Sequence, residues 1–104
     1  MASGKNYLEY ILEQLSGLGE IRWRAMMGEY LLYYQGKLVG GIYDDRLLVK
    51  PTPSAKALLP EAPLALPYEG AKEMLLVEET DDRELLAALL NAVAEDLPAP
   101  RKRS

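Results

Sequence analysis

Cysteine and histidine are both absent from this chain of 104 residues. Without cysteine there is no disulfide, no thiolate nucleophile and no Cys-based zinc or iron–sulfur site. Without histidine there is no Ser-His-Asp triad, and the usual general base and most transition-metal ligation are lost. No spacing of the remaining polar residues matches a calcium loop, a phosphate loop or a catalytic dyad. We therefore expect a protein that is not an enzyme and that holds no metal or cofactor.

Long hydrophobic runs are also missing. No stretch approaches the roughly 20 apolar residues that a membrane span requires. Near the N-terminus, Glu9 and Glu13 interrupt the apolar residues, so this segment does not have the pattern of a signal peptide. We expect a cytoplasmic protein without a membrane partner.

Basic residues are too few for a protein that holds nucleic acid mainly through its phosphates. The chain has 16 acidic and 12 basic residues and a net charge of −4, whereas phosphate binding needs a concentrated basic face. The one dense basic run, at residues 101–103, follows two prolines. We expect a folded domain over residues 1–97 and a flexible basic tail over 98–104. The tail would serve solubility or, alternatively, electrostatic docking or weak nucleic-acid contact.

Hydrophobic periodicity predicts a helix at each end of the domain. An apolar stripe at helical spacing covers residues 5–17, where Asn6 and Glu9 have the spacing of a capping box. A second stripe covers residues 81–96, with Asp81 as the expected N-cap and Glu84 three residues later. A short helix is expected at 54–59, begun by Thr52 or the proline after it.

The residues between the terminal helices predict an antiparallel β-meander. Extended segments are expected at 21–25, 29–35, 38–43 and 46–50, with turns at Gln35-Gly36-Lys37 and Asp44-Asp45. A further short strand, 74–77, is expected at a sheet edge. The fold class is therefore α+β, with a sheet of about four to five strands flanked by helices. Gly40-Gly41 interrupts one strand, either for a bulge or close helix packing or to leave room for a ligand or partner.

The order of motifs in the central stretch resembles the N-terminal domain of the TfoX (Sxy) competence-regulator family. The likeness covers about residues 5–97, and Met27 and Glu29 stand where many members have Phe and Gly. The matching motifs are Arg24-Ala25-Met26-Met27-Gly28-Glu29-Tyr30, Leu32-Tyr33, Gly36-Lys37, Asp44-Asp45-Arg46-Leu47, Lys50, Pro67-Tyr68 and the strand at 74–79.

This resemblance implies a fold and a broad role. The implied fold is a curved antiparallel sheet flanked by helices, similar to secretion-chaperone-like dimers. The larger family regulators carry a second domain that resembles helix-hairpin-helix DNA-binding modules, and the chain resembles a stand-alone member without that half. The implied role is non-enzymatic regulation related to competence.

One candidate binding site lies around the first turn of the meander. Arg22 and Arg24 alternate on one face of a strand and Lys50 ends another strand, so a sheet that joined them would hold an anion or a carboxylate. The alternative is that Arg24 pairs with Glu29 and that two methionines fill core gaps. The candidate ligand or partner residues are Arg24, Met26, Met27, Gly28, Glu29, Tyr30 and Lys50.

Seven tyrosines, one tryptophan and no phenylalanine form an uneven aromatic set. Tyrosines on a strand pack a core or an interface, or, next to arginines, stack nucleobases. Packing in a core or an interface is the favoured role. The candidate core or dimer aromatics are Tyr30, Tyr33, Tyr34 and Tyr43. Elsewhere, Glu78-Glu79 and Asp81-Asp82 form a cluster that is either a solvated acidic edge or, less favoured, a site for a divalent cation.

The predicted strands carry apolar residues on both faces of the sheet, and only about three helices are available to cover them. An apolar sheet face left uncovered predicts association with another protein. The leading hypothesis is a regulatory or adaptor domain that forms a homodimer and binds a further, unidentified protein. A small-ligand or nucleotide sensor is the alternative. A DNA-associated transcription co-regulator is the weaker alternative hypothesis.

Overall fold

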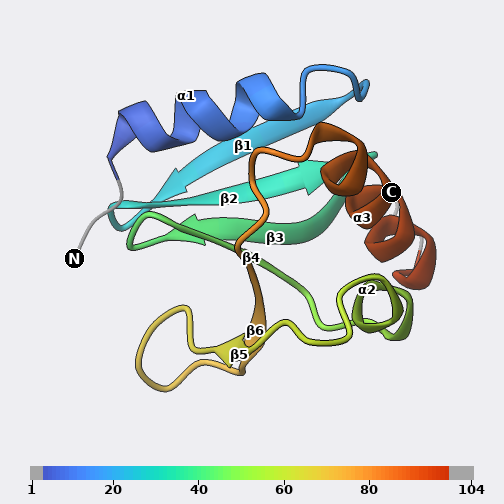
Figure 1. Ribbon diagram of the computed structural model, residues 1–104. Helices are drawn as coiled ribbons and strands as arrows, with labels where there is room; N and C mark the ends of the chain where they lie inside the picture. Colours follow the sequence, from blue (N-terminus) through green and yellow to red (C-terminus); the bar gives the residue numbers. More distant parts are fainter. Residues whose placement is uncertain (1–3, 99–104) are drawn as a thin grey trace, which may run out of the picture.

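Six strands form one antiparallel sheet in the computed structural model, which describes residues 4–98 (Figure 1). The strands are β1 (Ile21–Met26), β2 (Glu29–Tyr34), β3 (Lys37–Tyr43), β4 (Arg46–Val49), β5 (Leu64–Ala65) and β6 (Met74–Val77). Their order across the sheet is β1-β2-β3-β4-β6-β5. The predicted α+β class and the antiparallel meander are confirmed, with six strands where four to five were expected.

Both hairpin turns predicted in the meander are confirmed. Gln35 and Gly36 have φ values of 56° and 77°, and Asp44 and Asp45 have values of 54° and 56°. Two consecutive positive φ angles characterise the type I′ turn, whose twist matches that of the flanking strands. Asp tolerates this left-handed conformation better than most non-glycine residues, so Asp-Asp serves where Asn-Gly is common.

Three helices accompany the sheet: α1 (Lys5–Gln14), α2 (Pro53–Leu58) and α3 (Arg83–Asp96). Two predicted caps are wrong by one or two positions. The N-cap of α1 is Gly4, without a side-chain bond, so there is no capping box at Asn6 and Glu9. The N-cap of α3 is Asp82, which accepts from the Leu85 N–H at 3.0 Å. Thr52 caps α2, as expected.

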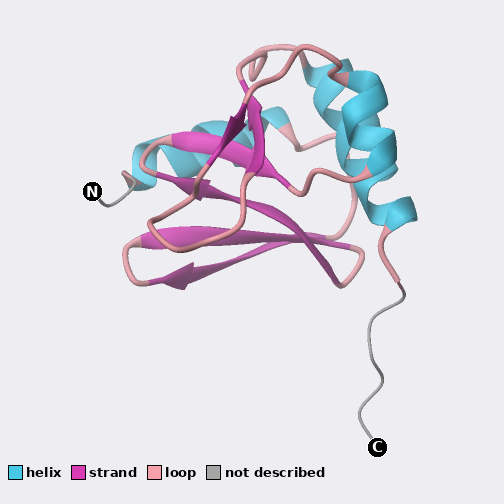
Figure 2. Cartoon of the chain, turned by 90° about the horizontal axis from the view of Figure 1, so that it is seen from below, coloured by secondary structure: helices cyan, strands magenta, loops and turns pink. Residues whose placement is uncertain are grey.

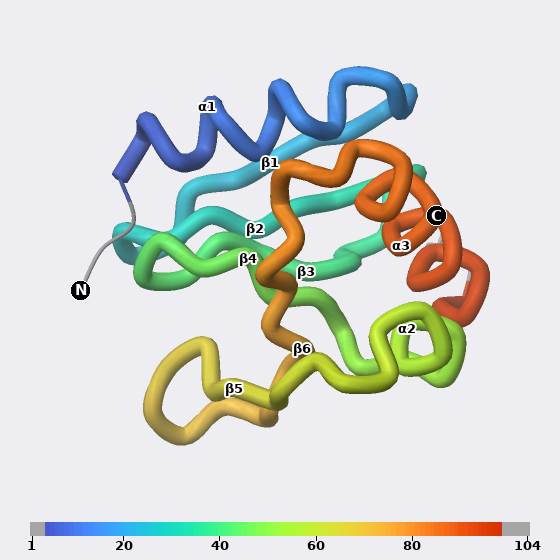
Figure 3. The backbone as a smooth tube through the Cα atoms, in the orientation of Figure 1, coloured from blue at the N-terminus to red at the C-terminus, as the bar shows by residue number. Residues whose placement is uncertain are grey.

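One face of the sheet packs against all three helices and forms the core. Alternating strand residues meet the apolar stripes of α1 and α3 and the small residues of α2. Figure 3 shows both long helices against the sheet. The core comprises Leu8, Ile11, Leu15, Leu32, Tyr34, Val39, Ile42, Leu47, Val49, Ala55, Leu59, Leu75, Val77, Leu86, Leu89, Leu90, Val93 and Ala94.

Two polar side chains of the meander reach α3 from within this face. The Tyr34 hydroxyl donates to Asn91 Oδ1 at 2.7 Å. The Lys37 ammonium donates to the carbonyl oxygens of Ala94 and Leu97 at 2.7 and 3.3 Å. A cation there gives the last carbonyl groups of the helix a further donor and complements the helix dipole. These bonds fix the end of α3 over the β2–β3 hairpin.

The strand at residues 74–77 does not lie at the sheet edge, contrary to expectation. β6 pairs with β4 on one side and with β5 on the other. β5 was not predicted, because it has only two residues and no readable alternation. Its brevity follows from Pro63 and Pro67, since proline has no N–H to give to a ladder.

The other face of the sheet carries no helix within residues 4–98, and Figure 2 shows α1 behind the strands on the far side. Residues directly opposite each other on neighbouring strands share a face, and the pairing assigns this one. We call it the helix-free face. Its residues are Arg22, Arg24, Met26, Glu29, Leu31, Tyr33, Leu38, Tyr43, Arg46, Leu48 and Leu76.

A loop partly covers the helix-free face. Residues 66–73 connect β5 to β6 and curl back toward the β3–β4 turn (Figure 3). Arg46 holds the loop, since its guanidinium donates to the Leu66 carbonyl oxygen at 3.0 Å and to that of Tyr43 at 3.1 Å. Within this loop, Pro67 is buried. The face is therefore closed near β4 and open near β1 and β2. Of the predicted tail, all but Pro98 lies outside the described residues.

Candidate functional site

The first candidate site does not form as a single cluster. Arg24 lies on the edge strand β1, and Lys50 follows β4, three strands away. Both point to the helix-free face, but three strand spacings separate them by roughly 14 Å. Tyr30 lies on the core face, where its ring packs edge-on against Trp23 with ring centroids 5.6 Å apart. One small anion therefore cannot contact all three residues.

The turn between β1 and β2 presents an exposed apolar side chain. Met27 has a φ of 53° and is 93% exposed, and Gly28 has a φ of 86°. The prediction that Met27 fills a core gap is therefore wrong, while Met26 is half-buried. A positive φ is unfavourable for a side chain of this size. The site thus keeps a large apolar residue at a strained and solvent-facing position.

Glu29 ties the β1–β2 turn to the β3–β4 turn. Its carboxylate accepts the backbone N–H of Asp44 at 3.0 Å. The pairing of Arg24 with Glu29 stays a prediction, and the strand register places both residues on the helix-free face. Met26, Met27 and Glu29 border an apolar hollow of about 520 Å³ that Tyr43 and Tyr68 complete.

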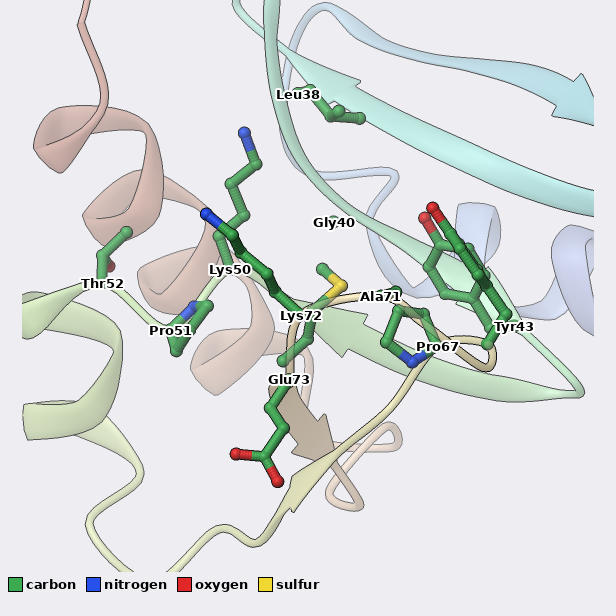
Figure 4. A pocket seen from close by; sticks show the side chains of 12 residues that line it. Leu38, Gly40, Tyr43, Lys50, Pro51, Thr52, Pro67, Ala71, Lys72 and Glu73 are labelled. Carbon is green, nitrogen blue, oxygen red and sulfur yellow. The ribbon is translucent and has the colours of Figure 1, made fainter.

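A second pocket of about 460 Å³ lies between the sheet and the loop, and we call it the lysine–tyrosine pocket. Figure 4 shows Lys50 and Lys72 at one end, Tyr43 at the other, and Gly40 between them. Tyr43 and Tyr68 pack with ring centroids 6.2 Å apart. The lining residues are Leu38, Gly40, Tyr43, Lys50, Pro51, Thr52, Pro67, Tyr68, Ala71, Lys72, Glu73 and Met74.

The glycine pair of β3 is explained first by packing. A Cβ at Gly40 would lie 2.2 Å from the Leu48 carbonyl oxygen, and one at Gly41 would lie 2.7 Å from that of Tyr30. The register shifts between Leu32 and Tyr33, which is the predicted bulge. The bulge is thus confirmed, whereas the close contacts are with the backbones of β2 and β4 and not, as predicted, with a helix. The bare backbone at Gly40 also forms part of the pocket wall.

The predicted aromatics divide between the two faces. Tyr34 is a core residue, and Tyr30 packs against the core. Tyr33 and Tyr43 lie on the helix-free face, the former half-buried and the latter buried. Burial raises the pKa of Tyr43, with smaller contributions from Tyr68, Glu29 and Tyr33. The Tyr43 hydroxyl is therefore protonated at neutral pH and available as a donor.

Five contributors to the pocket were not predicted from the sequence: Pro67, Tyr68, Ala71, Lys72 and Glu73. They belong to the 66–73 loop, which has no periodicity from which its position over the sheet could be read. The Pro67-Tyr68 dipeptide was noted as part of the family likeness, and this was the only signal. Tyr68 is 53% exposed, so its ring is available to a ligand or partner.

Metal and membrane chemistry find no support in the described residues. Within residues 4–98, no three acidic side chains are grouped so that they could hold a metal ion, which includes the acidic run before α3. No helix in this part of the chain combines the length and apolar character needed to cross a membrane.

Comparison with known proteins assigns the chain to a family. A curated protein of Spirochaeta aurantia, described as an uncharacterized 12.7 kDa protein in the trpE 5′ region, is 32% identical over 104 residues. The alignment covers 99% of this chain and 90% of the relative. Residues 13–95 match the TfoX N-terminal domain, so the match includes the whole sheet and most of α3. The chain belongs to the TfoX N-terminal domain family, which is linked to competence regulation.

Proposed function

We propose that this protein is a non-enzymatic regulatory or adaptor domain that works by binding another protein through its helix-free face. The supporting observation is the uneven covering of the sheet: three helices pack on one face, whereas among residues 4–98 only the 66–73 loop lies over the other. Near β1 and β2 the apolar residues Leu31 and Tyr33 stay half-exposed and Met27 is almost fully exposed. An uncovered apolar surface of this kind favours association.

The charges around this face indicate the chemistry of the partner. Four cationic side chains surround it, those of Arg22, Arg24, Lys50 and Lys72, and two carboxylates, those of Glu29 and Glu73. The face therefore has more positive than negative side chains, although the whole chain has a net charge of −4. An acidic surface with a few apolar side chains would complement such a face. Cations on the rim would chiefly raise the association rate, and the apolar centre would supply most of the affinity.

A second copy of the chain remains one possible partner, and the charge pattern constrains how it binds. Stacking two helix-free faces in register would bring arginines near arginines. An offset arrangement that sets Glu29 of one copy near Arg24 of the other avoids this repulsion. Light scattering over a wide range of concentrations tests the homodimer directly, because a strict monomer would rule it out and leave a different protein as the partner.

The experiment that tests the proposal compares two variants in affinity capture from the native host. The Met27→Ser/Leu31→Gln double variant removes apolar area from the helix-free face. Leu58→Ser removes a comparably exposed leucine from α2, outside this face. If the face is the interface, the double variant loses the partner by roughly tenfold or more in affinity while Leu58→Ser keeps it. Retention of the same partner by both variants would refute the proposal.

Small-ligand sensing is a second candidate function, favoured by the lysine–tyrosine pocket. Its volume of about 460 Å³ is within the range of small-molecule sites, roughly 300 to 1,000 Å³. A ligand that binds only the folded state raises the melting temperature, so a screen of metabolites by thermal shift tests this function. Nucleic acid is the weakest candidate, and an oligonucleotide titration at physiological salt examines it.

A further inference from the structure

The two lysines of the lysine–tyrosine pocket have no partner of opposite charge. Neither the Lys50 ammonium nor the Lys72 ammonium makes a hydrogen bond or an ion pair with another residue of the described chain. Glu73 is the one acidic residue in the lining, and Figure 4 shows its carboxylate turned away from both ammonium groups. Two cations at one end of a partly enclosed hollow leave a positive potential that an anion would neutralise.

The opposite end of the pocket is aromatic and apolar. Tyr43 is buried and Tyr68 is half-exposed beside it, and the Pro67 ring joins them in the lining. Between the two ends, Gly40 contributes only backbone, which gives a flat wall without a side chain. A planar apolar group fits such a slot, because aromatic side chains favour stacked or edge-on contact with another ring.

The geometry points to a ligand class: we propose that the lysine–tyrosine pocket binds a small organic anion whose planar apolar body lies against Tyr43 and Tyr68 and whose carboxylate or phosphate reaches Lys50 and Lys72. This proposal rests on the second candidate function and is independent of the protein interface. The acid group gives orientation, and the ring gives most of the buried apolar area. Lysine suits either acid, since its ammonium acts as a point charge.

A pair of fluorescent molecules separates the charged end from the apolar end. The first is 8-anilinonaphthalene-1-sulfonate, a planar anion. The second is N-phenyl-1-naphthylamine, which has the same rings without the acid. We expect the Lys50→Gln/Lys72→Gln double variant to bind the sulfonate about tenfold more weakly than the wild type, because two charge-assisted contacts to a partly exposed site are lost. Binding of the uncharged molecule should change by less than about twofold, because its apolar contacts remain.

Matched controls show whether the effect belongs to the pocket. Lys56→Gln removes an exposed lysine of α2 that does not line the pocket, and it should leave sulfonate binding unchanged. Tyr68→Ala should weaken binding of both molecules, because it removes the ring contact that they share. If the double lysine variant binds the sulfonate as well as the wild type does, or loses both molecules equally, the proposal is overturned.

Two measurements on the unaltered chain keep the proposal testable even if a variant fails to fold. Sulfonate binding should weaken as ionic strength rises, whereas binding of the uncharged molecule should not. Competition with 1-naphthoate and with adenosine monophosphate then identifies the acid that the site prefers. Displacement by either one supports the proposal and names a carboxylate or a phosphate. Displacement by neither would mean that the sulfonate is an adventitious additive only.

Failure of this proposal is distinguishable from failure of the protein-binding function. The double lysine variant would still capture a protein partner, although more slowly, because cations on the rim chiefly set the association rate and the apolar residues near Met27 supply most of the affinity. The Met27→Ser/Leu31→Gln variant would still bind the sulfonate, because neither residue lines the lysine–tyrosine pocket. Each experiment therefore reports on one end of the helix-free face.

Discussion

Asp96, in the last turn of α3, caps α2 by binding Ser54. Its carboxylate accepts the Ser54 backbone N–H at 2.7 Å and the Ser54 hydroxyl at 3.0 Å. An acidic residue at the end of its own helix is unfavourable, but the same carboxylate lies at the start of α2, where N–H groups have no partner within the helix. The bond thus joins the C-terminal end of α3 to the N-terminal end of α2.

The first prediction concerns pH and Asp96. The hydrogen bond from the Ser54 N–H, followed by smaller contributions from the Ser54 and Thr52 side chains, holds the pKa of this carboxyl below its ordinary value of 3.8. A lowered folded-state pKa gives stability that is present above the ordinary value and lost as pH falls through the folded-state pKa. Asp96→Asn should therefore lower the melting temperature at neutral pH, and the difference from wild type should shrink in acid.

Thermal unfolding across this pH range is the measurement, and Glu95→Gln is the matched control. It removes the same charge from the same end of α3, but the Glu95 carboxylate makes no hydrogen bond with another described residue. A constant difference between wild type and Asp96→Asn at every pH would contradict the prediction.

The second prediction concerns the close approach of β3 and β4. Gly40→Ala would place a Cβ 2.2 Å from the Leu48 carbonyl oxygen and 2.9 Å from Val49 Cα. Because both atoms are backbone, the strands must separate, and we expect a loss of about 3 kcal/mol in the free energy of unfolding. Gly17→Ala is the control, since no atom lies within 4 Å of its added Cβ. Urea denaturation should show a change of less than about 0.5 kcal/mol there.

The third prediction separates stability from association at Met27. Met27→Gly relieves a residue held at a φ of 53°, so the folded chain should gain roughly 0.5 kcal/mol after the cost of glycine in the unfolded state. Gln35→Gly makes the same change at a φ of 56° in the second hairpin. Both variants should unfold at slightly higher urea concentration, but only Met27→Gly should weaken binding of a partner. Equal binding by both would show that Met27 is not part of the interface.

The fourth prediction concerns the hold of Arg46 on the 66–73 loop. Arg46→Met keeps the apolar stem but removes the bonds to the carbonyl oxygens of Leu66 and Tyr43. Loss of about 1 kcal/mol of local stability should speed amide hydrogen exchange in the loop by roughly fivefold. The amides of α3 should be unaffected.

Hydrogen exchange followed by mass spectrometry measures this effect. Arg83→Met serves as the control, because Arg83 makes a surface ion pair with Glu13 at 3.5 Å and does not contact the loop. Unchanged exchange in residues 66–73 of the Arg46 variant would show that the buried Pro67, and not the guanidinium, fixes the loop.

Local chemistry in the sequence accounts for the parts of the fold that were predicted well. The turn at Asp44-Asp45 and the turn at Gln35-Gly36 depend on which residues tolerate a positive φ, and this is a property of the residues themselves. The last helix follows from its apolar stripe. Its N-cap was misplaced by one position because Asp81 and Asp82 are adjacent and chemically identical, and only the structure shows which one begins the helix.

The candidate site was predicted less well because it depends on strand order and on loop position. Arg24 and Lys50 share a face, as their alternation indicated, but their separation is set by two intervening strands. Lys72 and Tyr68 enter the pocket from a loop with no periodic pattern. The position of β6 inside the sheet likewise required a two-residue neighbour that no sequence pattern reveals.

The position of β1 at the margin of the sheet has a consequence for self-association through backbone pairing. One side of this six-residue strand has no neighbouring strand among residues 4–98, and such a row of backbone groups is a template for strand addition. If β1 strands from two molecules aligned antiparallel around Trp23, each Arg22 would stand opposite an Arg24. Like charges in direct opposition are destabilising. The two arginines thus disfavour the pairing of two molecules through their β1 strands in this register.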